Sequence, residues 1–194
     1  NIPDGVTSIT GVFRDCIGLT SITIPEGVTS IGEWAFYGCS GLISLNIPDS
    51  VTSIGEEAFR NCSGLTSIDI PDEVTSIGDG AFRDCIGLTT VSIGSGVTSI
   101  GGFAFFGCSG LTSINIPDSV TAIGQDTFHG CSGLTSIDIP DGVTSIGHYA
   151  FEDCSGLTSV YCRPTTPPTL GADAFNSNAS DRKIYVPTSS TDAY

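Results

Sequence analysis

A repeat of 23 residues runs through most of this chain of 194 residues, and it restricts the possible folds more than any other sequence feature. Residues 62–72 and 131–141 carry the identical string CSGLTSIDIPD, 69 residues or three periods apart. A fixed period of this size is typical of solenoids, in which each unit contacts only its neighbours. The period is clearest in the cysteines, which stand at Cys16, Cys39, Cys62, Cys85, Cys108, Cys131 and Cys154.

Each unit divides into two extended segments and a turn. In residues 65–70, apolar and polar residues alternate as in a half-buried strand, and the Pro-Asp pair at 71–72 begins a turn. Residues 74–77 form a second short extended segment, and the spacing of Ala, Phe and Cys in residues 81–85 predicts one helical turn with an inward face. Because one unit buries too little apolar surface to fold alone, we expect the units to stack with their strands in parallel.

The unit reads Leu-x-x-Ile-x-Ile-Pro followed by Val-x-x-Ile-Gly-x-x-Ala-Phe-x-x-Cys. Over residues 2–187 it resembles the BspA-type leucine-rich repeat of bacterial and protist surface proteins. The resemblance implies a leucine-rich-repeat superhelix, exposure outside the cell, and adhesion or ligand binding, with no catalytic motif to carry over. The fold expected is therefore an α/β repeat, a right-handed leucine-rich-repeat solenoid of about eight coils with parallel strands and short helical turns.

The two ends depart from the repeat. We assign residues 1–163 to tandem repeats and residues 164–194 to a divergent last coil and C-terminal cap, because prolines interrupt the period there and Asn178 replaces cysteine. Residues 184–187 match the strand of earlier units and are expected to form the last strand. The first coil lacks its leading Leu-x-x-Ile and one further residue, so we expect more chain to precede it.

The charge balance restricts the partners. There are 6 Lys and Arg against 21 Asp and Glu, which gives a formal net charge of −15. Such a surface repels nucleic acid and anionic lipid, so neither is an expected partner. No apolar run approaches the roughly 18 residues that would insert in a membrane.

The reactive side chains favour a structural role. Seven cysteines share one inward column and Cys162 replaces a core aliphatic residue, so buried free thiols are expected, with disulfides and a metal site as the alternatives. His129 and His148, the two histidines, occupy columns that vary from coil to coil. No hydrolase, zinc-protease or phosphate-loop motif is present. We expect a protein without catalytic activity, cofactor or metal.

An acidic column follows the prolines of successive coils. Aspartate is favoured in such turns for local hydrogen bonding, and weak calcium binding between neighbouring carboxylates is the alternative. The column comprises Asp4, Glu26, Asp49, Asp72, Asp118 and Asp141.

Substitutions between coils concentrate in three columns on the outer side of the predicted turn. These columns gather aromatic and arginine side chains, the usual energetic anchors of interfaces, although relaxed drift on an outer surface would give the same pattern. The candidate ligand-binding residues are Trp34, Tyr37, Arg60, Arg83, Phe103, Phe106 and Tyr149.

The outward positions of the first strand form the alternative binding face. They are mostly small and polar, which favours weak or multivalent contact. They comprise Asn46, Asp69, Asn115, Asp138 and Tyr161. The predicted function is a non-enzymatic leucine-rich-repeat module on the cell surface, mediating adhesion or binding an extracellular protein or glycan. The alternative is a structural spacer or stalk that presents another domain of a longer surface protein.

Overall fold

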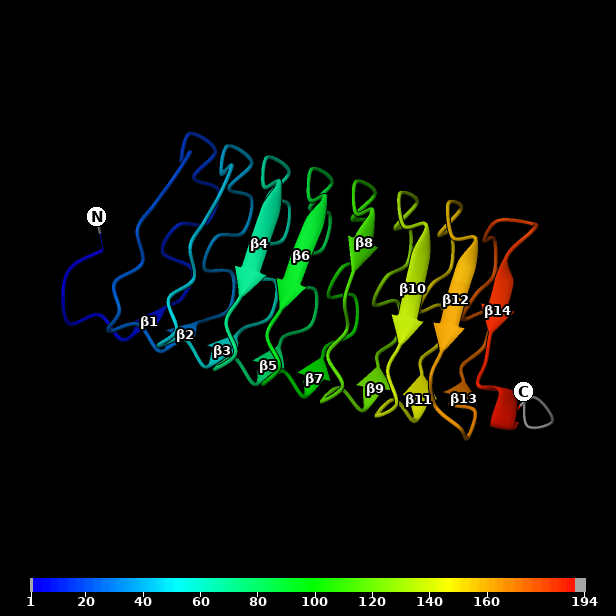
Figure 1. Ribbon diagram of the computed structural model, residues 1–194. Helices are drawn as coiled ribbons and strands as arrows, with labels where there is room; N and C mark the ends of the chain where they lie inside the picture. Colours follow the sequence, from blue (N-terminus) through cyan, green and yellow to red (C-terminus); the bar gives the residue numbers. More distant parts are fainter. Residues whose placement is uncertain (1, 191–194) are drawn as a thin grey trace.

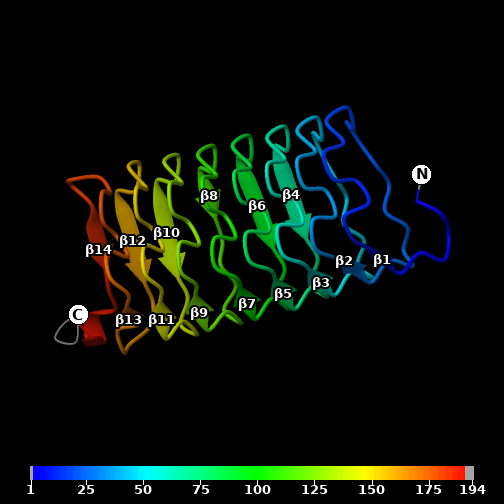
Figure 2. The same cartoon turned by 180° about the vertical axis from the view of Figure 1, so that it is seen from behind.

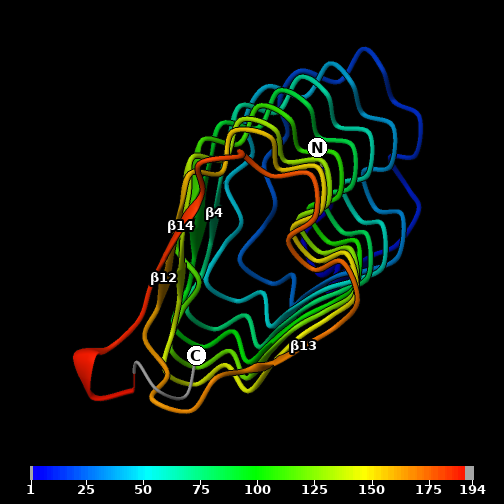
Figure 3. The same cartoon turned by 90° about the vertical axis from the view of Figure 1, so that its right-hand side faces the viewer.

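The computed structural model describes residues 2–190, and it is a row of coils stacked along one axis (Figure 1). Each strand pairs in parallel with the equivalent strand of an adjacent coil. Viewed along the axis, the coils lie almost over one another (Figure 3). The predicted parallel solenoid of about eight coils is confirmed. Residue 1 of the predicted repeat region and residues 191–194 of the predicted cap lie outside the described residues.

The second extended segment of every coil forms one continuous sheet, which Figure 1 and Figure 2 show from opposite sides. Each strand places its isoleucine or leucine one residue after a small residue, which is serine or threonine in every strand except β9. Successive strands are 23 residues apart except at the ends, where Ser8 pairs with Ser30 and Ser145 with Thr169. The strands are β1 (Ser8–Ile9), β2 (Ser30–Ile31), β3 (Ser53–Ile54), β5 (Ser76–Ile77), β7 (Ser99–Ile100), β9 (Ala122–Ile123), β11 (Ser145–Ile146) and β13 (Thr169–Leu170).

The first extended segment forms two three-stranded sheets on the other side of the coil. Exposed and buried residues alternate in β4 and β6, as the half-buried pattern predicts. The expected last strand is present as β14, where Ile184 pairs with Val160. The strands are β4 (Ser67–Ile70), β6 (Thr90–Ile93) and β8 (Ser113–Ile114), then β10 (Ser136–Ile139), β12 (Ser159–Cys162) and β14 (Lys183–Tyr185).

The predicted short helical turns are wrong. Among the described residues the only helix is a 3-10 turn, η1 (Thr188–Ser190). In residues 34–39, the amide of Ala35 donates within its coil to Gly32, but the amide of Phe36 donates to the carbonyl of Ala58 in the next coil (2.7 Å). Alternate amides therefore join neighbouring coils, which an α-helix cannot do because its amides bond along its own axis. The solenoid is built from strands and turns rather than as an α/β repeat.

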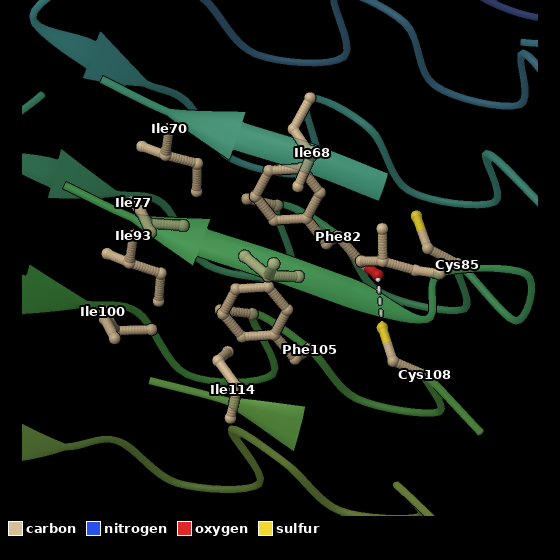
Figure 4. Packing of buried hydrophobic residues seen from close by; sticks show 14 of the residues in the cluster. Ile68, Ile70, Ile77, Phe82, Cys85, Ile93, Ile100, Phe105, Cys108 and Ile114 are labelled. Carbon is tan, nitrogen blue, oxygen red and sulfur yellow. Dashed lines mark hydrogen bonds between the residues drawn. The ribbon is translucent and has the colours of Figure 1, made fainter. Parts of the chain in front are cut away.

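A stack of phenylalanine rings runs through the core. Neighbouring rings are nearly parallel, with centroids 5.0–5.5 Å apart. Figure 4 shows two of them packed among the isoleucines of both sheet faces. The stack comprises Phe13, Phe36, Phe59, Phe82, Phe105, Phe128, Phe151 and Phe175, of which the central six are fully buried. The inward column that the repeat predicts is therefore confirmed.

The cysteine column lies beside this stack. All eight cysteines are free, and the six from Cys39 to Cys154 along the column are fully buried. Each of these thiols donates to the carbonyl of a phenylalanine in the preceding coil, as Cys108 does to Phe82 (3.1 Å, Figure 4). Burial raises the pKa of the Cys85 and Cys108 thiols well above the usual value.

In the last coil, which covers the end of the core, an asparagine side-chain amide takes the place of the cysteine thiol. Asn178 Nδ2 donates to the carbonyl of Phe151 (2.7 Å), the bond that cysteine makes in earlier coils. Arg182 Nη1 donates to the Phe175 carbonyl (2.7 Å) and to Asn178 Oδ1 (2.9 Å). The Arg182 guanidinium also lies over the Phe175 ring (5.5 Å), so a cation covers the end of the stack.

Close packing between coils depends on one glycine column, and Gly64→Ala is expected to destabilise the protein by about 1–3 kcal/mol. A Cβ at Gly64 would lie 2.5 Å from the carbonyl oxygen of Ser40, so the coils would have to move apart. Gly18 occupies the same column in the first coil, where a Cβ meets nothing within 4 Å. Urea unfolding should show almost no change for Gly18→Ala, and equal losses for the two variants would contradict this account.

Candidate binding surfaces

One position of each coil forms a ladder of stacked side chains on the outer turn. The Arg14 guanidinium lies 5.0 Å from the centroid of the Tyr37 ring, and Arg60 lies 5.7 Å from it on the next coil. Arg83 lies 4.8 Å from the ring centroid of Phe106. The outer ladder comprises Arg14, Tyr37, Arg60, Arg83, Phe106, His129 and Glu152. Four of the seven predicted site residues therefore share one stripe, and their rings are partly covered by guanidinium groups.

The other three predicted residues occupy the neighbouring column. Trp34 is 38% exposed and its Nε1 donates to Glu57 Oε2 (3.1 Å). The Phe103 ring lies 6.0 Å from that of Phe106. The Tyr149 ring lies beside His148 (6.2 Å) rather than beside a ladder ring. The structure thus places two aromatic groups, one near each end of the outer ladder, and sets Tyr149 apart from both.

The backbone at this second column is left-handed. Trp34, Phe103 and Tyr149 have φ of 54°, 58° and 59°, whereas glycine holds the same position at Gly11 and Gly80. The left-handed region costs a residue with a side chain about 1–2 kcal/mol, and aromatic residues have no local hydrogen bond to offset it. These three aromatics therefore carry a conformational cost that glycine would avoid, as do Glu57, Asp126 and Asp173 in the same column.

Both histidines are held by structural contacts. His129 Nδ1 lies 3.0 Å from Asp126 and 3.7 Å from Glu152, while its Nε2 lies 3.5 Å from Asp153. His148 Nδ1 accepts a hydrogen bond from the Ala172 amide (2.8 Å). At His129 the variable column therefore holds an imidazole surrounded by three carboxylates, which the repeat pattern does not reveal.

The strand face presents its predicted polar residues outward, and Asn46, Asp69 and Asn115 are exposed. The end of this face is more elaborate, because Asp138 accepts from Arg163 at both of its oxygens (2.8 and 2.5 Å). Tyr161 is 44% exposed and stacks on another tyrosine of the last coil. The alternative face is thus polar along most of its length and aromatic at its C-terminal end.

Arg163 and Tyr185 are the residues that sequence reasoning missed on this face. Tyr185 pairs in register with Tyr161, and the ring centroids are 4.7 Å apart. The sequence contains a signal for this contact, because matching residues 184–187 to the earlier strands aligns Tyr185 with Tyr161. Arg163 follows the strand and has no equivalent in earlier coils.

In the acidic turn column, the carboxylate of Asp72 bonds to the next coil rather than within its own turn. Asp72 Oδ1 accepts from the amide (2.6 Å) and the hydroxyl (3.0 Å) of Ser95 in the next coil. Within residues 2–190, no group of three or more His, Cys, Asp or Glu is arranged to hold a metal ion. That same part of the chain has no helix with the length and apolar character needed to span a bilayer.

Parallel coils with inward Leu, Ile, Phe and Cys columns define a leucine-rich-repeat solenoid. The family model described as BspA type leucine rich repeat region (6 copies) matches residues 1–111 and 75–193. The chain therefore belongs to the BspA-type leucine-rich-repeat family. A comparison with curated proteins finds no match.

Solved structures of bacterial leucine-rich-repeat proteins are similar. One from Bacteroides ovatus is 27% identical, with a TM-score of 0.75 over 95% of this chain and 65% of its own. A leucine rich cell surface protein from Faecalibacterium prausnitzii is 31% identical, with a TM-score of 0.61 over 99% of this chain and 61% of its own. The T. pallidum leucine-rich-repeat protein is 29% identical, with a TM-score of 0.69 over 80% and 74%. The chain thus spans just under two thirds of the first two relatives.

Proposed function

We propose that this protein is a non-enzymatic binding module of a cell-surface protein, which mediates adhesion by recognising an extracellular protein through its outer turn face. The surface location is supported by the family and by the relative described as a cell surface protein. The non-enzymatic role is supported by membership of the leucine-rich-repeat family. Arginine and aromatic side chains on one stripe are the usual anchors of such interfaces.

The observation that carries this proposal is backbone strain at the aromatic positions. Trp34, Phe103 and Tyr149 occupy left-handed positions that Gly11 and Gly80 fill without strain. A residue kept in a strained conformation, where an unstrained one is available, indicates a role other than stability. Contact with a partner is such a role for an exposed or half-buried ring.

The test is a variant with Trp34→Gly, Phe103→Gly and Tyr149→Gly. We expect at least a tenfold loss of binding to immobilised extracellular-matrix extract, measured by surface plasmon resonance, because the rings supply most of the anchoring area. The free energy of unfolding should change by less than about 1 kcal/mol per site, since relieved strain offsets lost contacts. The matched control Asp173→Gly changes the same column (φ 55°) without removing a ring and should bind normally.

A structural spacer is the second candidate function. It is favoured by the continuous eight-stranded sheet and by the phenylalanine stack, which together join the coils from one end to the other. Unchanged binding after substitution of the outer aromatics and of the strand face would favour the spacer. The acidic surface would then serve solubility rather than recognition.

A further inference from the structure

We propose that the C-terminal end of the strand face holds a saccharide-binding site, built on Tyr161, Tyr185, Arg163 and Asp141. This inference rests on the proposal that the protein is a binding module, but it uses a different surface from the outer ladder. The site lies in an open cavity of about 500 Å³ that is lined by these side chains together with Asp138 and Pro187. Ligand pockets of small molecules have volumes of about 300–1,000 Å³.

Two stacked tyrosines give the cavity an apolar platform. Their rings are 4.7 Å apart and inclined by 12°, and each residue is 44% exposed. Tyr185 belongs to β14, the edge strand of its sheet, so no strand within residues 2–190 pairs beyond it. A tyrosine held from below offers a rigid surface at little entropic cost, with a hydroxyl at its end. Such a platform suits the flat C–H face of a sugar ring.

A fixed donor lines the same cavity, on the side of Tyr161 that faces Asp138. Arg163 Nε and Nη2 both donate hydrogen bonds to the carboxylate of Asp138, which orients the guanidinium. The third nitrogen, Nη1, lies 3.5 Å from Asp118. An arginine held by a bidentate pair is fixed in direction, and the N–H groups that face neither Asp138 nor Asp118 remain for a ligand. The donor is thus organised before any ligand arrives, which reduces the entropic cost of binding.

An acceptor completes the set. Asp141 is exposed, lines the cavity, and carries no side-chain hydrogen bond to any described residue. Its two oxygens can accept from neighbouring hydroxyl groups. A donor and an acceptor flanking an aromatic surface match a polyol, whose hydroxyl groups both donate and accept.

The charge of the site disfavours an anionic ligand. The charged side chains lining the cavity are two carboxylates and one guanidinium, which sum to −1. An anion would meet Asp141 in a protein of net charge −15. A cation would gain only the carboxylate of Asp141, because Arg163 already neutralises Asp138 at hydrogen-bond distance. A neutral saccharide avoids the repulsion that an anion would meet, and it can contact the rings, the guanidinium and the carboxylate together.

The experiment begins with a printed array of neutral, sialylated and sulfated oligosaccharides probed with the whole chain. We expect neutral oligosaccharides to be retained, and titration calorimetry with the best of them to give at least tenfold weaker binding for Tyr185→Ser and for Asp141→Asn. Tyr185→Phe keeps the ring and should retain most of the affinity. Asp49→Asn changes the same turn column at the other end of the solenoid and should bind like the parent.

Three results would overturn the proposal. In the first, the parent protein retains no neutral saccharide on the array. In the second, it binds only charged oligosaccharides or an oligolysine peptide. In the third, a folded Tyr185→Ser variant binds with unchanged affinity. Saturation-transfer NMR on the parent protein identifies tyrosine contacts with the sugar even if a variant unfolds, and absence of tyrosine contacts would also overturn it. The substitutions in the outer-face variant do not change this site, so the experiments on the two surfaces can fail independently of each other.

Discussion

Raising the pH from about 8 to about 11 is expected to unfold this protein cooperatively, because its buried thiols release their protons far less readily in the folded state than in the unfolded state. Burial raises the pKa of Cys39 to about 11 and that of Cys154 to about 12, and it raises the pKa of the column thiols between them as well. Nearby thiols add to the effect, as Cys108 does for Cys85. The cause common to all is loss of water around a group that would become charged.

The sign of the effect follows from these raised values. Below about pH 8.5 the thiols are protonated in both states, so they give no pH dependence. Above it the unfolded chain releases protons that the folded chain keeps, and each buried thiol lowers the free energy of unfolding by about 1.4 kcal/mol per pH unit. The six fully buried thiols together remove about 8 kcal/mol over one such unit. That amount is comparable with the whole stability of a domain, about 5–15 kcal/mol.

Urea unfolding under reducing conditions at several pH values checks this expectation. The variant with Cys85→Ala, Cys108→Ala and Cys131→Ala removes three of the six thiols and should halve the slope of stability against pH above about pH 9. A control with Ser109→Ala, Ser132→Ala and Ser155→Ala changes exposed residues that directly follow three of the column cysteines and should keep the full slope. A slope that is the same in the cysteine variant would contradict the role of the thiols.

Replacing Phe82 by alanine is expected to cost about 3–5 kcal/mol. The Phe82 ring is fully buried and stacks on Phe59 (5.1 Å) and Phe105 (5.3 Å). Its removal leaves a cavity that the coils cannot close, because hydrogen bonds on both sides of the turn fix their spacing. The gap also weakens the coupling between the two halves of the solenoid, so unfolding should become less cooperative.

Urea denaturation followed by circular dichroism measures both effects of Phe82→Ala. We expect a lower midpoint and a broader or divided transition. Phe103→Ala removes the same ring from a half-buried position on the outer turn and should cost less than about 1 kcal/mol. If the two variants lost equal stability, the stack would not be the main support of the core.

Much of this fold is predictable because a solenoid converts sequence order into spatial order. Each coil contacts only its neighbours, so a residue and its image 23 positions on are also neighbours in space. The alternation in residues 67–70, the inward Phe82 and Cys85, and the capping role of Asn178 could all be predicted from the period and from departures from it.

The candidate surfaces were predictable only as columns. The sequence places Tyr37, Arg60 and Phe106 at equivalent positions, but it does not show that arginines lie over the rings. Nor does it show that the backbone at Trp34 and Phe103 is left-handed, because glycine, acidic and aromatic residues alternate in that column. The contacts of these side chains depend on which residue the adjacent coil presents.

By itself, the sequence determined the period, the buried columns and the parallel stacking. These features depend on apolar spacing alone, and each coil can bury its apolar side chains only against another coil. Only the tertiary structure decided the form of the turn, since the spacing of Ala81, Phe82 and Cys85 suits both a helix and amides that bond between coils. The tertiary structure also decided the contacts of Arg163 with Asp138 and of Tyr185 with Tyr161, because these contacts form where the regular period is broken.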